Sequence, residues 1–90
     1  MMTKTATKAK TKITIYGAEW CAYCHMVKHY LKDKGIDYTY IDIDKEPEAG
    51  LEAVEKSGQR GIPVTDIAGD IIIGFDRPKI DAALSAHKLG

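Results

Sequence analysis

Alternation of polar and apolar positions predicts two strands in the first half of the chain. Residues 12–16 read Lys-Ile-Thr-Ile-Tyr, and residues 36–43 read Ile-Asp-Tyr-Thr-Tyr-Ile-Asp-Ile. Successive side chains of a strand point to opposite faces of the sheet, and β-branched and aromatic residues are typical of strands. Each segment therefore predicts a strand with one buried face.

Between these strands, apolar residues recur at helical spacing. They predict a helix over residues 21–34 with one apolar face. Gly35 follows it, where a left-handed residue commonly ends a helix. The expected apolar face consists of Tyr23, Val27, Tyr30 and Leu31.

Residues 44–58 predict a second helix. Asp44, Pro47 and Glu48 supply the acidic and proline residues that are typical of a helix start, and Ser57-Gly58 ends the helix. We expect Leu51 and Val54 to form its buried stripe.

The last third of the chain predicts a hairpin and a final helix. A strand over residues 62–67 opens near Pro63, where a missing N–H is tolerated, and residues 68–70 turn the chain into a strand over 71–73. Asp76 and Pro78 mark the start of the last helix. One face of that helix carries Ile80, Ala83, Leu84 and His87, and we interpret His87 as a surface residue at the helix end.

The order of elements is strand, helix, strand, helix, strand, strand, helix. A right-handed crossover makes the first two strands parallel, and the hairpin makes the last two antiparallel. The sequence therefore predicts an α/β fold with a four-stranded mixed sheet flanked by three helices, which cover both of its faces.

Composition narrows the function classes. Ninety residues form one domain, and a formal net charge of zero argues against a dedicated nucleic-acid binder, which would carry a basic excess. No segment is long and apolar enough to span a membrane. Residues 1–11 are expected to be a flexible basic tail without the apolar centre of a secretory signal, and residues 12–90 the folded domain. We expect a cytoplasmic monomer.

The chemistry centres on Cys21-Ala22-Tyr23-Cys24, where the first strand gives way to the first helix. A helix N-terminus presents unpaired N–H groups and a partial positive charge, which stabilise a thiolate at Cys21 and lower its pKa. Cys24 lies one turn later, within disulfide reach, and is expected to be the more buried of the two. Cys21 can therefore attack a disulfide, and Cys24 can resolve the mixed disulfide that forms.

Three other interpretations of the cysteine pair exist. With His25 the motif also matches a c-type haem attachment site, and Cys21, Cys24 and His25 or His29 are candidate zinc ligands. An export signal and a second cysteine pair, which would support these interpretations, are absent from the sequence. A buried inert pair is the third alternative, and the position at a helix start counts against it.

Neighbouring residues supply candidate substrate contacts. Trp20 is interpreted as an exposed aromatic wall, and Tyr23 either lines the same site or covers the sheet edge. His25 either adds positive charge beside Cys21 or is a solvated surface residue. If the Ile62–Pro63 bond is cis, the bend displays the backbone of Ile62 beside Cys21, where an extended substrate can pair with it.

Together these residues resemble the glutaredoxins of the thioredoxin-fold superfamily over residues 12–88. The resemblance rests on Trp20-Cys21-Ala22-Tyr23-Cys24, on residues 57–63 (Ser-Gly-Gln-Arg-Gly-Ile-Pro) and on Ile73-Gly74-Phe75-Asp76. It implies a thioredoxin-like fold, a nucleophilic Cys21, a cis Ile62–Pro63 bond, and reduction of protein disulfides or glutathione mixed disulfides.

The resemblance also implies a glutathione site without a tightly bound cofactor or metal. Arg60 or Gln59 would hold the glycyl carboxylate, Ile62 and Pro63 the cysteinyl unit, and Asp76 beside Gly74 the γ-glutamyl ammonium. Two departures weaken such a site: Ala18 stands where the family often has Lys, and Phe75 where it has the second Gly of a pair.

The electron donor has two candidates. The segment Gly74-Phe75-Asp76-Arg77-Pro78 is similar to the tail of ribonucleotide-reductase-associated redoxins, which take electrons from thioredoxin reductase instead of glutathione. The partners expected are therefore disulfide-containing proteins and one or both of these donors. The alternative class is a non-catalytic thioredoxin-fold module that binds zinc or an iron–sulfur cluster.

Overall fold

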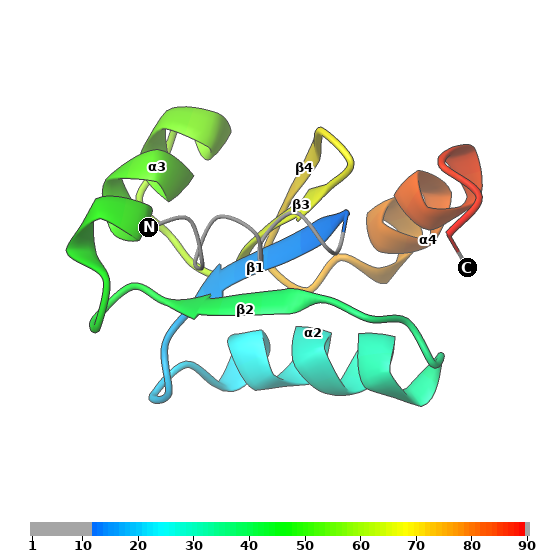
Figure 1. Ribbon diagram of the computed structural model, residues 1–90, viewed down its shortest axis with the longest axis horizontal. Helices are drawn as coiled ribbons and strands as arrows, with labels where there is room; N and C mark the ends of the chain where they lie inside the picture. The colour runs from blue at the N-terminus through cyan, green and yellow to red at the C-terminus, as the bar shows by residue number, and fades with distance from the viewer. Residues whose placement is uncertain (1–11, 90) are drawn as a thin grey trace, which may run out of the picture.

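A computed structural model describes residues 12–89 and contains all seven expected elements (Figure 1). The elements are β1 (Ile13–Gly17), α2 (Ala22–Asp33), β2 (Thr39–Asp42), α3 (Pro47–Ser57), β3 (Val64–Ile67), β4 (Asp70–Ile73) and α4 (Arg77–Ala86). The four strands form one sheet in the order β2-β1-β3-β4. The expected element order is confirmed. The expected tail over residues 1–11 lies outside the described residues.

Strand pairing confirms the mixed sheet. β1 pairs with β2 in parallel, and both the β1–β3 and β3–β4 pairs are antiparallel. Tyr16, near the end of β1, lies opposite Val64 at the start of β3. Because β1 leads into the cysteines and Pro63 precedes β3, this register places the two candidate motifs at the same edge of the sheet.

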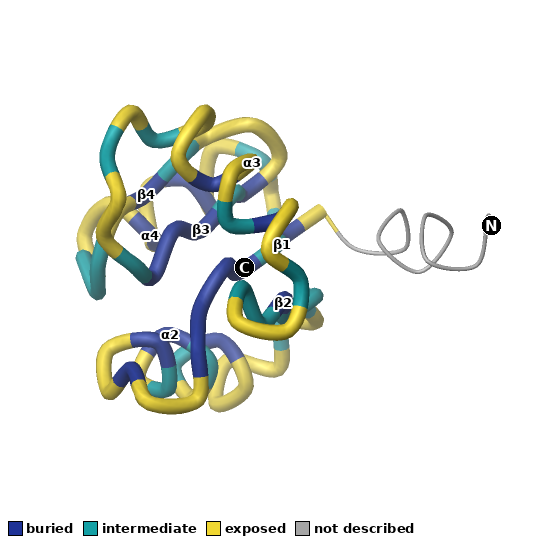
Figure 2. The backbone as a smooth tube through the Cα atoms, turned by 90° about the vertical axis from the view of Figure 1, so that its left-hand side faces the viewer, coloured by how far each residue is buried: buried dark blue, intermediate teal, exposed yellow. Residues whose placement is uncertain are grey.

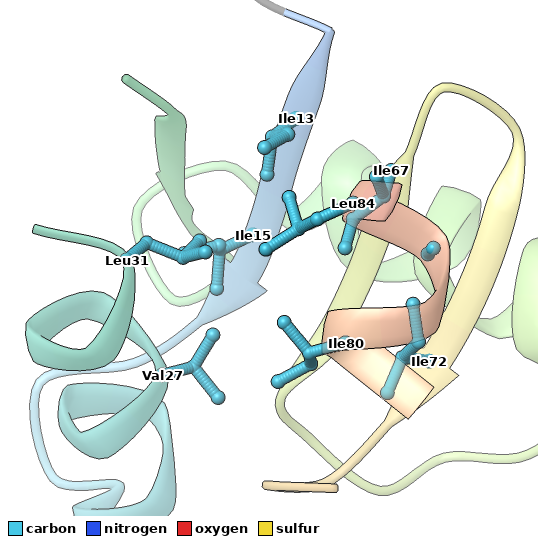
Figure 3. Close-up of a cluster of buried hydrophobic side chains, with 9 residues drawn as sticks. Ile13, Ile15, Val27, Leu31, Ile67, Ile72, Ile80 and Leu84 are labelled. Carbon is cyan, nitrogen blue, oxygen red and sulfur yellow. The ribbon is translucent and has the colours of Figure 1, made fainter. Parts of the chain in front are cut away.

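Two apolar layers cover the sheet. Ile13 and Ile15 of β1 face α2 and α4, whereas Tyr16 faces α3 (Figures 1 and 3). The larger cluster consists of Ile13, Ile15, Val27, Leu31, Ile67, Ile72, Ile80, Ala83 and Leu84. The central strands are accordingly the most buried part of the backbone in Figure 2. The expectation of helices on both faces is confirmed.

The expected buried stripe of α3 is wrong. Leu51 is 71% exposed and Val54 37%, whereas Ala49 and Ala53 are the buried residues of this helix. Small side chains allow a helix to approach a sheet closely, so α3 packs through its alanines and turns the larger side chains outward. Leu51 and Val54 therefore form an apolar patch on the surface and not a buried stripe.

The expectation that Tyr23 lies on the buried face of the first helix is also wrong. The buried face of α2 runs through Cys24, Val27 and Leu31, and Tyr23 is 61% exposed.

β2 is shorter than expected, because β1 offers it partners only from Thr14 to Gly17. Residues 62 and 63 precede β3 instead of opening it, since the pairing with β1 ends at Val64.

Local signals at the ends of elements are confirmed. Gly35 and Gly58 have positive φ after α2 and α3, and the Asp76 carboxylate accepts a hydrogen bond from the N–H of Lys79 at the start of α4. His87 ends α4 at the surface, with its Nε2 3.0 Å from Asp70 Oδ2. Within residues 12–89, no helix has the length and apolar character to cross a membrane.

Candidate active site

Cys21 and Cys24 are joined by a disulfide, with their Cα atoms 5.3 Å apart. Cys21 is the N-cap of α2 and Cys24 lies in its first turn. Cys24 is completely buried and Cys21 is 7% exposed. Cys24 is therefore the more buried residue of the pair, as expected.

The helix start directs a backbone N–H at the sulfur of Cys21. The backbone N–H of Cys24 donates to Cys21 Sγ over 3.2 Å, and the first turn of α2 contains no acidic residue. An N–H donor and the positive end of a helix dipole both favour a negative charge on the cap side chain. The position thus favours a thiolate when the disulfide is reduced.

Gly17 and Tyr40 form the floor beneath the disulfide. A Cβ at Gly17 would lie only 2.6 Å from the Tyr40 hydroxyl oxygen and 2.8 Å from Cys24 Sγ. Any larger residue at position 17 would therefore displace one of these groups. The Tyr40 hydroxyl donates to the Ala18 carbonyl over 3.1 Å, which fixes the loop that leads to Cys21.

Ala18 is fully buried and packs in one cluster with both cysteines. Its side chain does not face solvent. Ala18, which stands where the family often has lysine, is therefore a core position and not a vacant place on the surface. A lysine at this position would have to bury its stem against the disulfide. Lost packing therefore competes with any added charge.

The cis Ile62–Pro63 bond is confirmed. Ile62 is partly buried and packs against the cluster of Ala18, Cys21 and Cys24. The N–H of Gly74 donates to the carbonyl of Pro63 over 2.9 Å, and Gly74 has a positive φ that favours glycine. The structure thus brings Ile62 of the second motif to the cysteine cluster, and Gly74 of the third motif to Pro63.

Trp20 is 71% exposed beside the cysteines, and its indole Nε1 donates to Asp44 Oδ2 over 2.8 Å. His25 Nε2 lies 2.7 Å from the carbonyl oxygen of Glu19. This contact between the His25 ring and the backbone of Glu19 holds the loop before Cys21 in place.

The segment between α3 and Pro63 is held by Gln59. Its side-chain amide accepts from the N–H of Gly61 over 2.6 Å and donates to the Gly61 carbonyl over 2.9 Å. Both ends of the amide are therefore occupied within the loop. Arg60 is exposed, whereas Gln59 is only partly exposed.

A pocket of about 290 Å³ borders this segment. Its lining includes the apolar residues Ile43, Pro47, Leu51 and Val54, together with Arg60 and Ile62. Ile62 also packs on the cysteine cluster, so this residue is shared by the pocket and the surroundings of the disulfide. The outward turn of Leu51 and Val54 creates this surface.

Metal ligands do not gather near the cysteines. Across residues 12–89, no three or more His, Cys, Asp or Glu side chains lie together in a way that could hold a metal ion. The zinc set of Cys21, Cys24 and His25 or His29 is not assembled.

Sequence reasoning missed Gly17, Tyr40 and Asp44. The alternation in residues 36–43 carries a signal for Tyr40, because its parity places it on the face opposite to Ile41, which packs toward α3. Asp44 was interpreted only as a helix-start residue. Its contact with Trp20 joins residues 24 positions apart, and no local pattern records it.

Comparisons with known proteins agree with this geometry. The glutaredoxin family model matches residues 13–72. The chain is 40% identical over 67 residues to the glutaredoxin-like protein NrdH of Escherichia coli (strain K12), which covers 74% of this chain and 80% of that protein. It is 38% identical over 69 residues to a glutaredoxin-like protein encoded in the rubredoxin operon of Clostridium pasteurianum, covering 77% and 92% of the two chains.

The fold has close counterparts among solved structures. NrdH-redoxin from Escherichia coli superposes with a TM-score of 0.69 at 34% identity, covering 78% of this chain and 91% of that chain. The glutaredoxin of Archaeoglobus fulgidus has a TM-score of 0.77, covers 82% of this chain and 86% of its own, and at 23% identity supports the thioredoxin-like fold alone. Because the glutaredoxin family model matches most of this chain, the chain belongs to the glutaredoxin family.

Proposed function

We propose that this protein is a dithiol thiol–disulfide oxidoreductase in which Cys21 attacks and Cys24 resolves. One observation carries the proposal. Cys21 is the N-cap of α2, is 7% exposed and accepts a backbone hydrogen bond at its Sγ, while Cys24 is fully buried. The two sulfurs therefore occupy different environments that suit two different steps.

In the first step the Cys21 thiolate attacks one sulfur of a substrate disulfide. A bond forms from Cys21 Sγ to that sulfur, and the other substrate sulfur leaves as a thiolate that takes up a proton. In the second step the Cys24 thiol loses its proton and attacks Cys21 Sγ, which releases the second substrate sulfur. Two electrons pass from the cysteine pair to the substrate, and the disulfide of this structure forms.

The surroundings of the disulfide suit an extended substrate segment. Ile62 packs against the cysteine cluster, which supports a role for its backbone as a pairing edge, and Trp20 and Tyr23 supply exposed aromatic surface. Protein disulfides are the substrates that such a surface recognises best, because backbone pairing is independent of the substrate's side chains. The family as a whole supports this chemistry, and a cytoplasmic location goes with it as part of the proposal.

Glutathione is proposed as a usable but weakly bound donor. Arg60 is free to meet its glycyl carboxylate, Ile62 its cysteinyl backbone and Asp76 its ammonium group. Phe75 counts against tight docking, because its ring packs edge-on against Tyr30 with centroids 5.8 Å apart and occupies the place of a family glycine. The related NrdH-redoxin of Escherichia coli has a thioredoxin-like activity profile, so thioredoxin reductase is the second proposed donor.

The test compares the two donor systems on one small disulfide. Turnover is measured with glutathione plus its reductase, and separately with thioredoxin reductase. Arg60→Ala should lower glutathione-coupled turnover roughly tenfold, as expected for one charge-assisted contact, and leave the other system within about twofold. Lys32→Ala, a charge removal on the exposed side of α2, is the matched control.

The outcomes separate the parts of the proposal. Turnover with neither donor would contradict the oxidoreductase itself. Turnover with both donors that is insensitive to Arg60→Ala would contradict the glutathione site and leave the cysteine chemistry standing.

A further inference from the structure

The buried position of Cys24 does not by itself favour the thiolate that the resolving step requires. The resolving step needs a thiolate on Cys24, and this residue is completely buried. Burial disfavours the charged form of a thiol. The helix N-cap supports Cys21 instead, because the N–H of Cys24 itself points at Cys21 Sγ. Cys24 therefore needs a polar neighbour from another element.

The hydroxyl of Tyr40 lies in the right place. The tyrosine packs against the cluster of Ala18, Cys21 and Cys24. Its hydroxyl oxygen and Cys24 Sγ are both so close to Gly17 that a single added Cβ would meet them at 2.6 and 2.8 Å. The absence of a side chain at Gly17 thus leaves a space that the hydroxyl and the sulfur both border.

In the oxidised protein this hydroxyl donates to the Ala18 carbonyl over 3.1 Å. A disulfide sulfur carries no charge and is a weak acceptor, so the carbonyl is the better partner in this state. A hydroxyl hydrogen turns about its C–O bond to suit its strongest acceptor. A thiolate at Cys24 is such an acceptor, because hydrogen bonds to ionised groups are about twice as strong as neutral ones.

The charges around Tyr40 keep it a donor. Burial raises the pKa of Tyr40 above its ordinary value of 10.0, and the carboxylates of Asp42 and Glu19 and the neighbouring Tyr38 add to this shift. From α2, the ammonium of Lys28 lies 4.3 Å from the centre of the Tyr40 ring. The phenol therefore retains its proton throughout the neutral range, with a cation held above its ring.

We propose that Tyr40 is the hydrogen-bond donor that supports Cys24 in the resolving step. When the Cys21–substrate mixed disulfide has formed, the Tyr40 O–H turns from the Ala18 carbonyl to Cys24 Sγ. The Cys24 proton passes to solvent, and the stabilised thiolate attacks Cys21 Sγ. The bond from Cys21 to the substrate sulfur breaks, and that sulfur takes up a proton. This inference rests on the proposed function and adds a residue to it.

The two steps can be separated with dithiobis(nitrobenzoate), which releases one coloured thiolate in each. The reduced full-length protein is mixed with an equimolar amount of this disulfide, and the two phases are followed by stopped-flow absorbance across a pH series. Tyr40→Phe keeps the ring and removes only the hydroxyl. Its second phase should slow roughly tenfold, a change of about 1.4 kcal/mol in barrier, while the first phase stays within about twofold. The midpoint of the second phase's pH profile should move upward by about one unit.

Tyr38→Phe is the matched control, since it removes a phenolic oxygen two residues away on the same segment. It should alter neither phase. An unchanged second phase in Tyr40→Phe, or an equal slowing of both phases without a change in pH profile, would overturn the role of Tyr40. If the wild-type protein showed no second phase at all, the dithiol function itself would fail, and this inference with it.

Discussion

The indole Nε1 of Trp20 donates a hydrogen bond of 2.8 Å to Asp44 Oδ2, which ties the loop before the disulfide to the turn before α3. Trp20 is otherwise largely exposed. A large aromatic side chain on a loop usually samples several rotamers, and this bond selects one of them. The aromatic wall beside Cys21 is therefore oriented before a substrate arrives.

Asp44→Ala should release the indole. Because Trp20 is the only tryptophan of the chain, its fluorescence anisotropy reports this motion directly and should fall. The KM for a protein disulfide should rise several-fold with a smaller change in kcat, since the loss is one of pre-organisation worth roughly 1 kcal/mol. Asp44→Asn keeps an acceptor oxygen and should stay near the wild type. Unchanged anisotropy in Asp44→Ala would refute the fixed orientation.

The two cysteines should respond differently to substitution. Cys21→Ser should abolish all turnover, because it removes the proposed nucleophile. Cys24→Ser should accumulate mixed disulfides with protein substrates, visible by mass spectrometry of the unreduced protein, yet retain activity on glutathione adducts. Full activity of Cys21→Ser would disprove the assignment of the nucleophile.

Thr65 offers a test of the core. Its Oγ1 is buried and has no hydrogen-bond partner among the described residues, and the residue pairs with Ile15 and Ile72 in the sheet. Thr65→Val replaces the hydroxyl by a methyl group and should raise the free energy of unfolding by roughly 1 kcal/mol. Thr65→Ser keeps the hydroxyl, loses the methyl group and should be destabilising. Urea unfolding of the oxidised protein measures both, and a destabilised Thr65→Val would reveal a partner for the hydroxyl.

Alkaline stability should depend on Lys56. Partial burial lowers the pKa of Lys56, but hydrogen bonds to Asp66 and Tyr16, at 2.6 and 2.9 Å, outweigh burial and leave the pKa above its ordinary 10.5. A cationic group whose pKa is raised by folding stabilises the fold fully below 10.5, and this contribution is lost as the pH rises through the folded value. Burial also raises the pKa of Tyr16 above 10.0, which acts in the same direction.

Asp66→Asn removes the carboxylate partner of Lys56 while leaving an oxygen for the N–H of Gly69, which Asp66 also binds. The variant should be less stable at pH 8 and should lose less stability than the wild type above pH ~10.5. Asp33→Asn at the end of α2 is the control. Equal pH dependence of Asp66→Asn and wild type in chemical unfolding would exclude this ion pair as a source of stability.

Local patterns were sufficient for much of the fold. Residues 12–16 and 71–73 alternate or carry β-branched side chains, and the glycines after the helices occupy positive φ, so each element could be identified from its own residues. The buried face of α3 could not be identified in this way, because the choice between Leu51 and Ala53 as the buried residue depends on how closely the helix approaches the sheet. Helical spacing alone admits both faces.

The candidate site divides in the same way. The cysteine pair and Pro63 carry their chemistry in residue type and position, and the structure places Ile62, the residue before the cis proline, against the cysteine cluster. The contacts of Trp20 with Asp44 and of Tyr40 with Ala18 arise only when β2 is placed beside β1. Contacts between segments that are distant in sequence leave no periodic signal in either segment.

The burial of Cys24 behind Cys21 also determines how the protein meets an oxidant. A peroxide that oxidised the less buried Cys21 would form a sulfenic acid there. Cys24, whose Cα lies 5.3 Å from that of Cys21, is close enough to condense with such a group to a disulfide and release water. Damage that would otherwise proceed to irreversible sulfinic acid ends in a form that the ordinary reductant restores.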